Sequence, residues 1–383
     1  MRVALVHDYL NEFGGAERVL EVLAEMYPEA PIYTAFYRPE GEAYKWFKQR
    51  TIIHSWAQSI PGFATKLHSP LRFLAPLIWE SFDLSEFDVV ISSASWYITK
   101  GVITRPETLH ICYCHTPPRY LYGYDTSINW QRYWPVRIYA GIVNKFLRQY
   151  DFLAAQRVDE FVANSKNVQE RIKKFYRREA IVVYPPAELA ISGLRREISK
   201  SLVASRESRE YYLVISRLVG GKGLSMAVEA ANQLKIPLKV VGVGGGYSRE
   251  EKRLKAMAGP SVEFLGFVAD DKLTELYSGA KAFLALAKDE DFGLTPVEAM
   301  LCGTPVIAYN GGGYRETVVE GKTGIKFDEY SVEGLMGAIK KLQATSYKPQ
   351  DMINHAQKFS KERFVREMGK LVEEKWQEKQ DEV

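Results

Sequence analysis

The chain has 383 residues, of which 46% are apolar, and this is enough for about two domains with buried cores. Its 51 lysines and arginines are spread among 47 acidic residues, for a net charge of +4, so the sequence does not indicate a nucleic-acid-binding surface. Three cysteines in no disulfide pattern, a quickly polar N-terminus and the lack of a membrane-spanning apolar run lead us to expect a cytoplasmic protein.

The chain opens with an expected strand over 2–7, a loop over 8–15 and a helix. Gly14 and Gly15 stand at the start of this helix. Paired glycines let backbone amides approach a ligand closely, and a helix N-terminus favours negative charge. A plain turn explains the two glycines equally simply, so both interpretations stay open.

Residues 46–87 are irregular and rich in aromatics, and 67–79 (LHSPLRFLAPLIW) are their most amphipathic part. This segment is either a packed excursion under the first domain or a surface that meets a lipid-linked acceptor or a bilayer, since Trp, Phe and Arg together suit that boundary.

Two further buried parallel strands are expected at 88–91 and 109–114. Cys112 and Cys114 share one face of the second strand, and with no second pair nearby they indicate core packing, not zinc binding. The strand ends at His115, which the following prolines hold at the carboxyl edge of the sheet. A lone histidine is usually structural, so a functional role needs further support.

The segment 130–148 mixes aromatic and basic residues, and Ser165 is expected to cap a helix over 167–176. This helix carries a basic run made of Arg171, Lys173, Lys174, Arg177 and Arg178. Such runs are usually solvated faces, and a membrane-facing patch is the alternative. A strand over 181–184 closes the first domain at 186, and the polar stretch 187–210 is the expected linker.

The second domain begins with a strand over 211–215, followed by a Gly-rich turn that carries Arg217 and Lys222. Two cations around glycines before a helix could hold one diphosphate, although a solvated turn is equally simple. Next, 242–246 (GVGGG), with Glu263 about twenty residues on, imitates a dinucleotide-binding fingerprint. That fingerprint normally follows the first strand of its domain, so we do not expect a nicotinamide enzyme.

The stretch 282–316 reads as strand, acidic loop, helix, strand and Gly-rich turn. Crevices at the carboxyl ends of such strands bind ligands in open α/β sheets. Two carboxylates stand out. Glu298 either serves a ligand or forms a capping box with Thr295, with Pro296 at the first helical position. Glu290 lies between Asp289 and Asp291, in a solvated loop or a metal-binding D-x-D.

The run EDFGLTPVEAMLCGTPVIAYNGGGYRE closely resembles the E-x7-E region of retaining, nucleotide-sugar-dependent glycosyltransferases of family four, although Asp291 stands where many members have Gly or Pro. The run ICYCHTPPRYLYGY resembles the branch that includes O-antigen mannosyltransferases. The resemblance implies the α/β GT-B fold, with two Rossmann-like doubly wound domains facing a cleft. Their bounds would be 1–186 and 211–360, and a C-terminal helix within 361–383 would cross back to the first domain.

The resemblance also implies roles for single residues. Arg217, Lys222 and the amides of Gly14 and Gly15 would bind the donor diphosphate, and Phe267 would lie against the nucleotide base. Glu298 would bind the ribose, and Glu290 would hold the sugar with the amides of Phe292, Gly293, Leu294 and Thr295. His115 would contact the sugar near its reactive carbon. Of these, His115, Arg217, Lys222 and Glu290 would be catalytic, without a metal or another cofactor.

The expected function is a retaining hexosyltransferase that moves mannose from GDP-mannose to a polyprenyl-diphosphate-linked glycan, in O-antigen or capsule assembly, with peripheral contact to the inner face of the cell membrane. Front-face attack is expected, because no carboxylate is evident in the first domain as a covalent nucleophile. The alternatives are a UDP-sugar-dependent transferase, a metal-dependent one using Asp289 and Asp291, and a GT-B protein that binds or epimerises a nucleotide sugar without transferring it.

Overall fold

The computed structural model describes residues 1–126, 133–188, 209–244 and 249–382. The chain forms two compact units. Unit 1 comprises Met1–Tyr124, Trp130–Pro186 and Lys361–Val383, and unit 2 comprises Asp125–Asn129 and Ala187–Ser360. Residues 189–208, most of the expected linker, and Gly245 and Gly246 of the fingerprint-like run lie outside the described residues.

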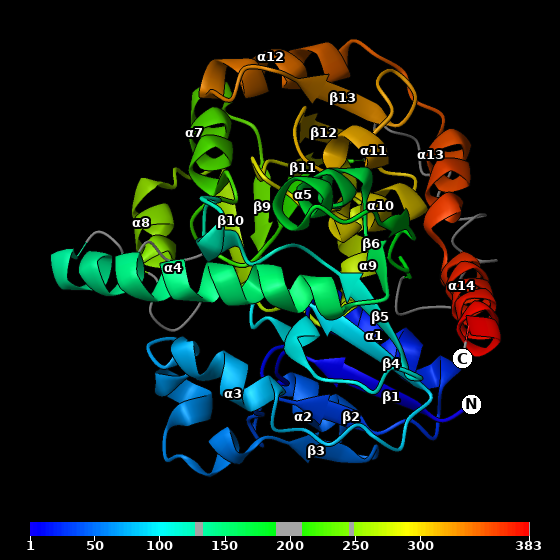
Figure 1. Ribbon diagram of the computed structural model, residues 1–383. Helices are drawn as coiled ribbons and strands as arrows, with labels where there is room; N and C mark the ends of the chain where they lie inside the picture. The colour runs from blue at the N-terminus through cyan, green and yellow to red at the C-terminus, as the bar shows by residue number, and fades with distance from the viewer. Residues whose placement is uncertain (127–132, 189–208, 245–248, 383) are drawn as a thin grey trace. The chain divides into compact units, whose positions relative to one another are not determined.

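Unit 1 is built on a seven-stranded parallel sheet with the order β3-β2-β1-β4-β5-β6-β7 (Figure 1). The strands are β1 Val3–His7, β2 Ile32–Thr34, β3 Ile52–His54, β4 Val89–Ala94, β5 Leu109–Cys114, β6 Glu160–Ala163 and β7 Ile181–Val182. The main helices are α1 Gly15–Met26, α2 Glu42–Phe47, α3 Ala75–Trp79, α4 Trp134–Arg157, α5 Lys166–Tyr176 and α14 Lys361–Glu382. Strands β1, β4 and β5 are buried along their whole length, which is why most of their residues are apolar and do not alternate with exposed polar ones.

Unit 2 has a six-stranded parallel sheet with the order β10-β9-β8-β11-β12-β13. Its strands are β8 Tyr211–Ile215, β9 Leu238–Val241, β10 Val262–Gly266, β11 Ala280–Ala285, β12 Val306–Tyr309 and β13 Gly324–Phe327. Its helices are α7 Leu224–Leu234, α8 Glu250–Met257, α9 Asp270–Ser278, α10 Leu294–Leu301, α11 Tyr314–Thr317, α12 Val332–Gln343 and α13 Pro349–Ala356. Two parallel-sheet α/β units confirm the expected Rossmann-like architecture.

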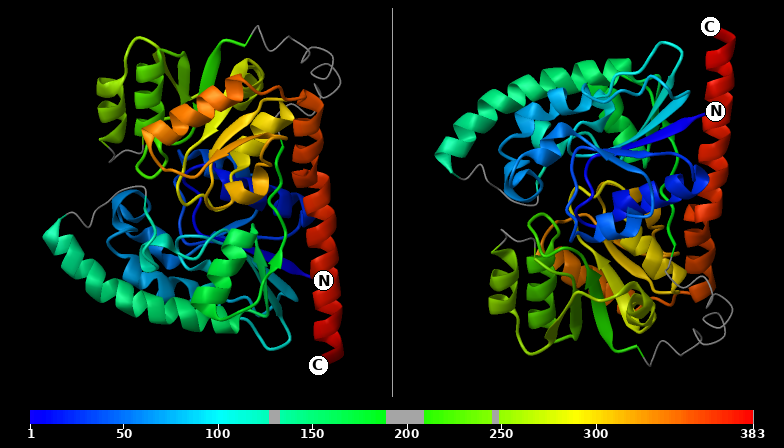
Figure 2. Two further views of the ribbon diagram at one scale, coloured as in Figure 1. Left: turned by 90° about the horizontal axis from the view of Figure 1, so that it is seen from above. Right: turned by 90° about the horizontal axis from the view of Figure 1, so that it is seen from below.

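The C-terminal helix α14 belongs to the core of unit 1. Phe364, Met368 and Val372 of α14 are buried together with Leu20 and Leu23 of α1. An ion pair of 2.7 Å between Lys361 and Glu25 adds a contact between the two helices. Figure 2 shows α14, in red, beside the N-terminus of the chain. The expected return of the C-terminal helix to the first unit is thus confirmed.

The basic run on α5 is not one solvated face. Ser165 caps α5, as expected, by accepting from the Val168 N–H at 3.1 Å. Lys173 and Lys174 are exposed, but Arg171 is buried. Its guanidinium donates to the Thr116 hydroxyl at 3.0 Å and stacks 4.0 Å from the ring centre of Tyr124. The solvated-face interpretation was therefore wrong for Arg171, because helical spacing turns that residue toward the sheet.

The aromatic segment 67–79 contains both packed and exposed residues. Ile78 and Trp79 of α3 are fully buried, whereas Leu77 is 60% and Phe73 is 40% exposed. Arg72 of the short helix η3 (Arg72–Leu74) donates to Asn144 of α4 at 2.9 Å, so η3 packs against α4. Within the described ranges, no helix is long and apolar enough to cross a bilayer.

Candidate active site

In each sheet, one pair of neighbouring strands marks the point where the strand order reverses. These pairs are β1 and β4 in unit 1, and β8 and β11 in unit 2. The connections that follow the two strands of such a pair run to opposite faces of the sheet, so a crevice opens at the carboxyl ends of the two strands. In unit 2, the turn after β8 carries Arg217 and Lys222, and the loop after β11 carries Glu290. The topology therefore brings these three sequence-predicted residues to one edge of the sheet.

Lys222 and Glu290 meet directly at this edge. The Lys222 ammonium donates to Glu290 Oε2 at 2.9 Å, and the side chains are 27% and 20% exposed. Half-buried charges on the two loops are thus paired, and both are still accessible from one side. A ligand that brings its own phosphate and hydroxyl groups could share Lys222 with Glu290, because an ammonium carries three donors.

The turn after β8 lies close to the end of β11. Gly223 has a φ of +70°, and a Cβ there would lie 2.5 Å from the Leu286 carbonyl oxygen. Only glycine allows this approach, which holds the Arg217 turn beside the Glu290 loop. Arg217 itself is exposed at the end of β8, so its guanidinium is accessible to an anionic ligand.

The Gly-rich turn after β12 packs against the backbone of the Glu290 loop. The Gly313 N–H donates to the Glu290 carbonyl at 2.8 Å. Gly312 has a φ of +53°, and a Cβ there would clash with the same carbonyl oxygen. The three consecutive glycines 311–313 are therefore needed for close backbone packing, which fixes where the Glu290 side chain begins.

Helix α10 begins at Leu294, with Gly293 as its N-cap at a φ of +92°. Thr295 thus lies inside the helix, and no side chain caps it. The capping-box interpretation of Thr295 and Glu298 was wrong, because glycine allows the helix to start earlier. Glu298 is only 4% exposed, and its Oε2 accepts from the Tyr277 hydroxyl of α9 at 2.7 Å. That bond orients the carboxylate assigned to the ribose.

The two phenylalanines assigned to the donor lie in different surroundings. Phe267 follows β10 and is 66% exposed, so its ring could stack on a base. Phe292 is only 3% exposed, and its ring packs edge-on against Phe359 with 5.4 Å between ring centres. Phe292 therefore offers a ligand its backbone amide and not its side chain.

In unit 1, the Gly14 amide already has a partner. Its N–H donates to Glu17 Oε2 at 2.9 Å, one turn into α1. Gly15 is the first residue of that helix. A diphosphate that used the Gly14 amide would have to share it with Glu17, so the amides of Gly15 and of the next residues are the more accessible donors.

His115 lies directly after β5 and is 8% exposed. The backbone N–H of His115 donates to the Ala94 carbonyl at 2.9 Å, which continues the β4–β5 pairing by one residue. Its Nε2 lies 2.8 Å from the Ser93 hydroxyl. Burial, with a smaller contribution from His7 nearby, lowers the pKa of the His115 imidazole to about 3, so the ring is neutral at physiological pH.

The chain matches two family models, one in each half. Residues 13–189 match Glycosyltransferase Family 4, and residues 195–359 match Glycosyl transferases group 1. The crystal structure of Anabaena Alr3699/HepE in complex with UDP and glucose superposes with a TM-score of 0.69 at 21% identity, covering 97% of this chain and 99% of that one. Together, the two matches support a glycosyltransferase of group 1 type. The fold of the chain is GT-B.

The individual proteins that this chain resembles are distant from it in sequence. It is 24% identical to an uncharacterized glycosyltransferase of Methanocaldococcus jannaschii over 58% of this chain and 61% of that one. It is 26% identical to the alpha-1,3/1,6-mannosyltransferase alg2 of Schizosaccharomyces pombe over 85% of this chain and 70% of that one. Across three of its curated relatives, the matches span 61%, 32% and 49% of their lengths.

Sequence reasoning missed several residues that shape the candidate site. Tyr314 follows the Gly-rich turn and is 4% exposed. Burial raises the pKa of its hydroxyl well above the usual value, and the Glu290 charge adds to this. Tyr277, His7, Glu17 and Ser93 were also missed. Among these residues, His7 alone gave a signal in the sequence, since it stands at the end of the first strand. The others act through partners from distant parts of the chain.

A buried ion pair in unit 1 was missed as well. The Lys100 ammonium donates to Asp151 of α4, and the two side chains are 2% and 0% exposed. The Tyr122 hydroxyl donates to the other carboxylate oxygen at 2.7 Å, and the Tyr176 ring centre lies 4.5 Å from the ammonium. This cluster joins α4 to α5 and to the segments that carry Lys100 and Tyr122.

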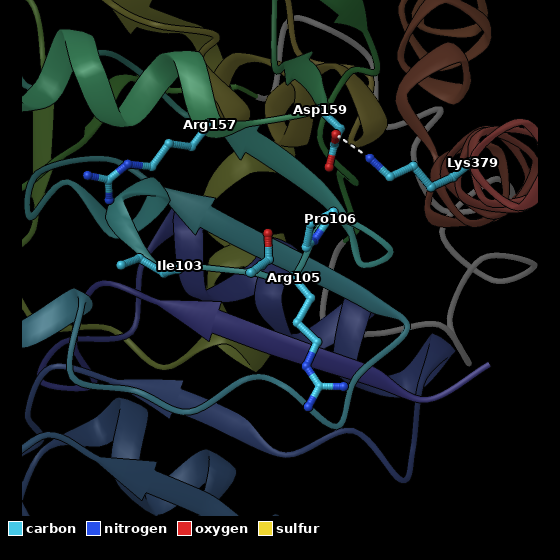
Figure 3. A pocket seen from close by; sticks show the side chains of 7 residues that line it. Ile103, Arg105, Pro106, Arg157, Asp159 and Lys379 are labelled. Atoms are coloured by element: carbon cyan, nitrogen blue, oxygen red, sulfur yellow. Dashed lines mark hydrogen bonds and ion pairs between the residues drawn. The ribbon is translucent and has the colours of Figure 1, made fainter. Parts of the chain in front are cut away.

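The hollow shown in Figure 3 lies in unit 1, away from His115. It has a volume of about 330 Å³ and is lined by Ile103, Thr104, Arg105, Pro106, Arg157, Asp159 and Lys379. Asp159 accepts from Lys379 of α14 at 2.9 Å. The lining residues other than Lys379 precede β5 or β6, at the amino ends of the strands. His115, in contrast, follows the carboxyl end of β5. The hollow therefore belongs to the opposite edge of the sheet.

Proposed function

We propose that this protein transfers a hexose from a nucleoside diphosphate sugar, and that the donor binds at the β8–β11 edge of unit 2. The observation that supports this most strongly is the direct pairing of Glu290, at 2.9 Å, with Lys222 on the turn that also carries the exposed Arg217. A cation pair for the diphosphate and a carboxylate for the sugar hydroxyls then lie on adjacent loops. Phe267 stacks on the base, Glu298 binds the ribose, and His115 contacts the sugar.

In the proposed reaction, negative charge grows on the β-phosphate as the sugar leaves. Arg217, Lys222 and the helix N-terminal amides stabilise this charge without a metal ion. The acceptor hydroxyl attacks from the face that the diphosphate leaves, the bond from the sugar to the β-phosphate breaks, and the departing phosphate oxygen takes the hydroxyl proton, so the configuration is retained. Three carboxylates follow β1 up to the first turn of α1, namely Asp8, Glu12 and Glu17, and each of them already has an interaction partner. Asp8 accepts from the amides of residues 95–97, and Glu17 accepts from His7 and Gly14. This supports front-face attack without a covalent nucleophile.

The proposed donor is GDP-mannose, with a polyprenyl-diphosphate-linked glycan as acceptor. The similarity to a curated mannosyltransferase along 85% of the chain supports mannose. A UDP-sugar is the second candidate, because the structural neighbour Alr3699/HepE was solved with UDP and with UDP-glucose.

The proposal predicts release of GDP from GDP-mannose when a polyprenyl-diphosphate-linked glycan is added, at equal rates with and without a chelator. NMR of the product should show an α-mannoside, the configuration of the donor. Release of UDP from UDP-sugars alone would replace mannose by another hexose. A β-mannoside, or turnover that a chelator abolishes, would contradict the proposed mechanism.

We further propose that α4 rests on an anionic lipid surface. Large apolar side chains recur along its exposed side, in the order Trp134 71%, Ile138 57%, Ile142 69%, Phe146 55% and Leu153 58% exposed. Arg137, Lys145 and Arg148 are exposed on the same helix, and its one carboxylate, Asp151, is buried. Figure 2 shows α4 as a long, gently curved helix. An apolar stripe flanked only by cations suits an anionic bilayer.

Replacing Ile142 and Leu153 together by serine should lower binding to phosphatidylglycerol vesicles by at least about tenfold, since burial of each such side chain is worth about 1.5–3 kcal/mol. Co-sedimentation measures the bound fraction. The control is Ile103→Ser, which removes an apolar side chain that is 49% exposed at the other edge of the sheet. Equal binding of all three proteins, or none by the unaltered protein, would refute a membrane role for α4.

A further inference from the structure

Four side chains of unit 1 form a continuous hydrogen-bonded chain. Glu17 Oε1 lies 3.2 Å from His7 Nε2, His7 Nδ1 lies 3.0 Å from the Ser93 hydroxyl, and that hydroxyl lies 2.8 Å from His115 Nε2. His7 and Ser93 are direct neighbours in the β1–β4 register, so their side chains share a face of the sheet. His7 is 1% and Ser93 is 1% exposed, which shields the chain from water.

The direction of each of these hydrogen bonds follows from the first residue in the series, Glu17. A carboxylate accepts hydrogen bonds and does not donate, so His7 Nε2 carries the hydrogen that faces Glu17. In a neutral imidazole the other nitrogen, Nδ1, is then an acceptor, and the Ser93 O–H points to it. The Ser93 oxygen is left to accept, so His115 carries its hydrogen on Nε2.

We propose that Glu17, His7 and Ser93 are positioning residues that fix His115 as its Nε2–H tautomer and so keep its Nδ1 a hydrogen-bond acceptor. The described residues give His115 Nδ1 no hydrogen-bond partner, so this nitrogen remains for a ligand. An acceptor nitrogen on an uncharged ring binds the hydrogen of a sugar hydroxyl and does not attract a phosphate. This inference rests on the proposed function, and it adds why His115 selects the sugar part of the donor.

The same series of hydrogen bonds also links His115 to the Gly14 turn. Glu17 accepts from His7 with one oxygen and from the Gly14 N–H with the other. The tautomer of His115 therefore depends on a carboxylate that also shapes the start of α1. No other role for the Glu17 charge is visible among the described residues.

Nitrogen-15 NMR of the free protein tests the tautomer directly, with the His115 signals assigned from a His115→Asn variant. The unaltered protein should show one neutral His115 with its hydrogen on Nε2. Ser93→Ala should give a mixture of tautomers. Glu17→Gln should increase the Nδ1–H form, because an amide can donate to His7 and so reverse the whole chain. A hydrogen on Nδ1 in the unaltered protein, or no change in either variant, would overturn the proposal.

The matched control is Ser92→Ala. Ser92 is the preceding residue of β4, and its hydroxyl lies 2.9 Å from the buried His110 Nε2, on the opposite face of the sheet. This variant removes an equivalent serine–histidine bond and should leave the His115 tautomer unchanged. With GDP-mannose as the donor, Ser93→Ala should lower kcat about 10- to 100-fold relative to Ser92→Ala and leave KM within about twofold.

Equal kcat in the two serine variants would overturn the positioning role. Absence of turnover in the unaltered protein would instead overturn the proposed function, and the NMR spectra would still decide the tautomer.

Discussion

Arg217→Ala is expected to lower the rate of sugar transfer by about 100- to 1,000-fold, the usual cost of removing one group that stabilises charge in a transition state. Arg217 is exposed at the end of β8, so its loss should leave the fold of unit 2 intact. Steady-state release of GDP from GDP-mannose measures the effect, and thermal unfolding checks the fold.

Arg366→Ala is the control, because Arg366 is an exposed arginine of α14 in the other unit. It should turn over donor at the rate of the unaltered protein. Turnover of Arg217→Ala within threefold of that rate would remove Arg217 from the proposed chemistry.

Lys100→Met is expected to destabilise unit 1 by about 3–5 kcal/mol, because it leaves the buried Asp151 carboxylate without its cation. The Tyr122 hydroxyl at 2.7 Å remains as a donor but carries no charge. Urea unfolding, followed by tryptophan fluorescence, measures the free energy of unfolding.

Two comparisons make the Lys100 result specific. Adding Asp151→Leu to Lys100→Met should recover most of the loss, since the buried charge is then gone. Lys341→Met removes a cation that is 63% exposed and pairs with Glu320 at 2.8 Å, and its loss of stability should be far smaller than that of Lys100→Met. Equal losses for Lys100→Met and Lys341→Met would show that the buried pair contributes no more than a surface one.

The fold was predictable because its strands are short buried runs with turn residues between them. Tyr211–Ile215 and Leu109–Cys114 have the bounds that apolar runs alone predicted. The start of α10 was not predictable, since Thr295, Pro296 and Glu298 satisfy the rules of a capping box. Gly293 overrides them with a left-handed conformation that depends on its packing against Tyr314, whose ring would lie 2.7 Å from a Cβ.

The candidate site was predictable where one loop carries the signal and not where partners come from distant strands. Lys222 and Glu290 were identified by motif and then found paired. Ser93 carries no local signal, because its role arises from the strand order that places β4 between β1 and β5. Arg171 was misassigned for a related reason, since its partner Thr116 is 55 residues away.

In the proposed function, unit 2 binds a nucleoside diphosphate sugar at Arg217, Lys222 and Glu290. Thermal unfolding with GDP, GDP-mannose, UDP, UDP-sugars and ADP, each with and without a chelator, tests it most directly. A ligand at a hundred times its Kd stabilises the fold by about 2.7 kcal/mol, which is readily measured.

We expect a chelator-insensitive stabilisation by GDP and GDP-mannose that Arg217→Ala abolishes. Stabilisation by uridine nucleotides alone would keep the site and discard mannose. No stabilisation by any nucleotide would contradict the account.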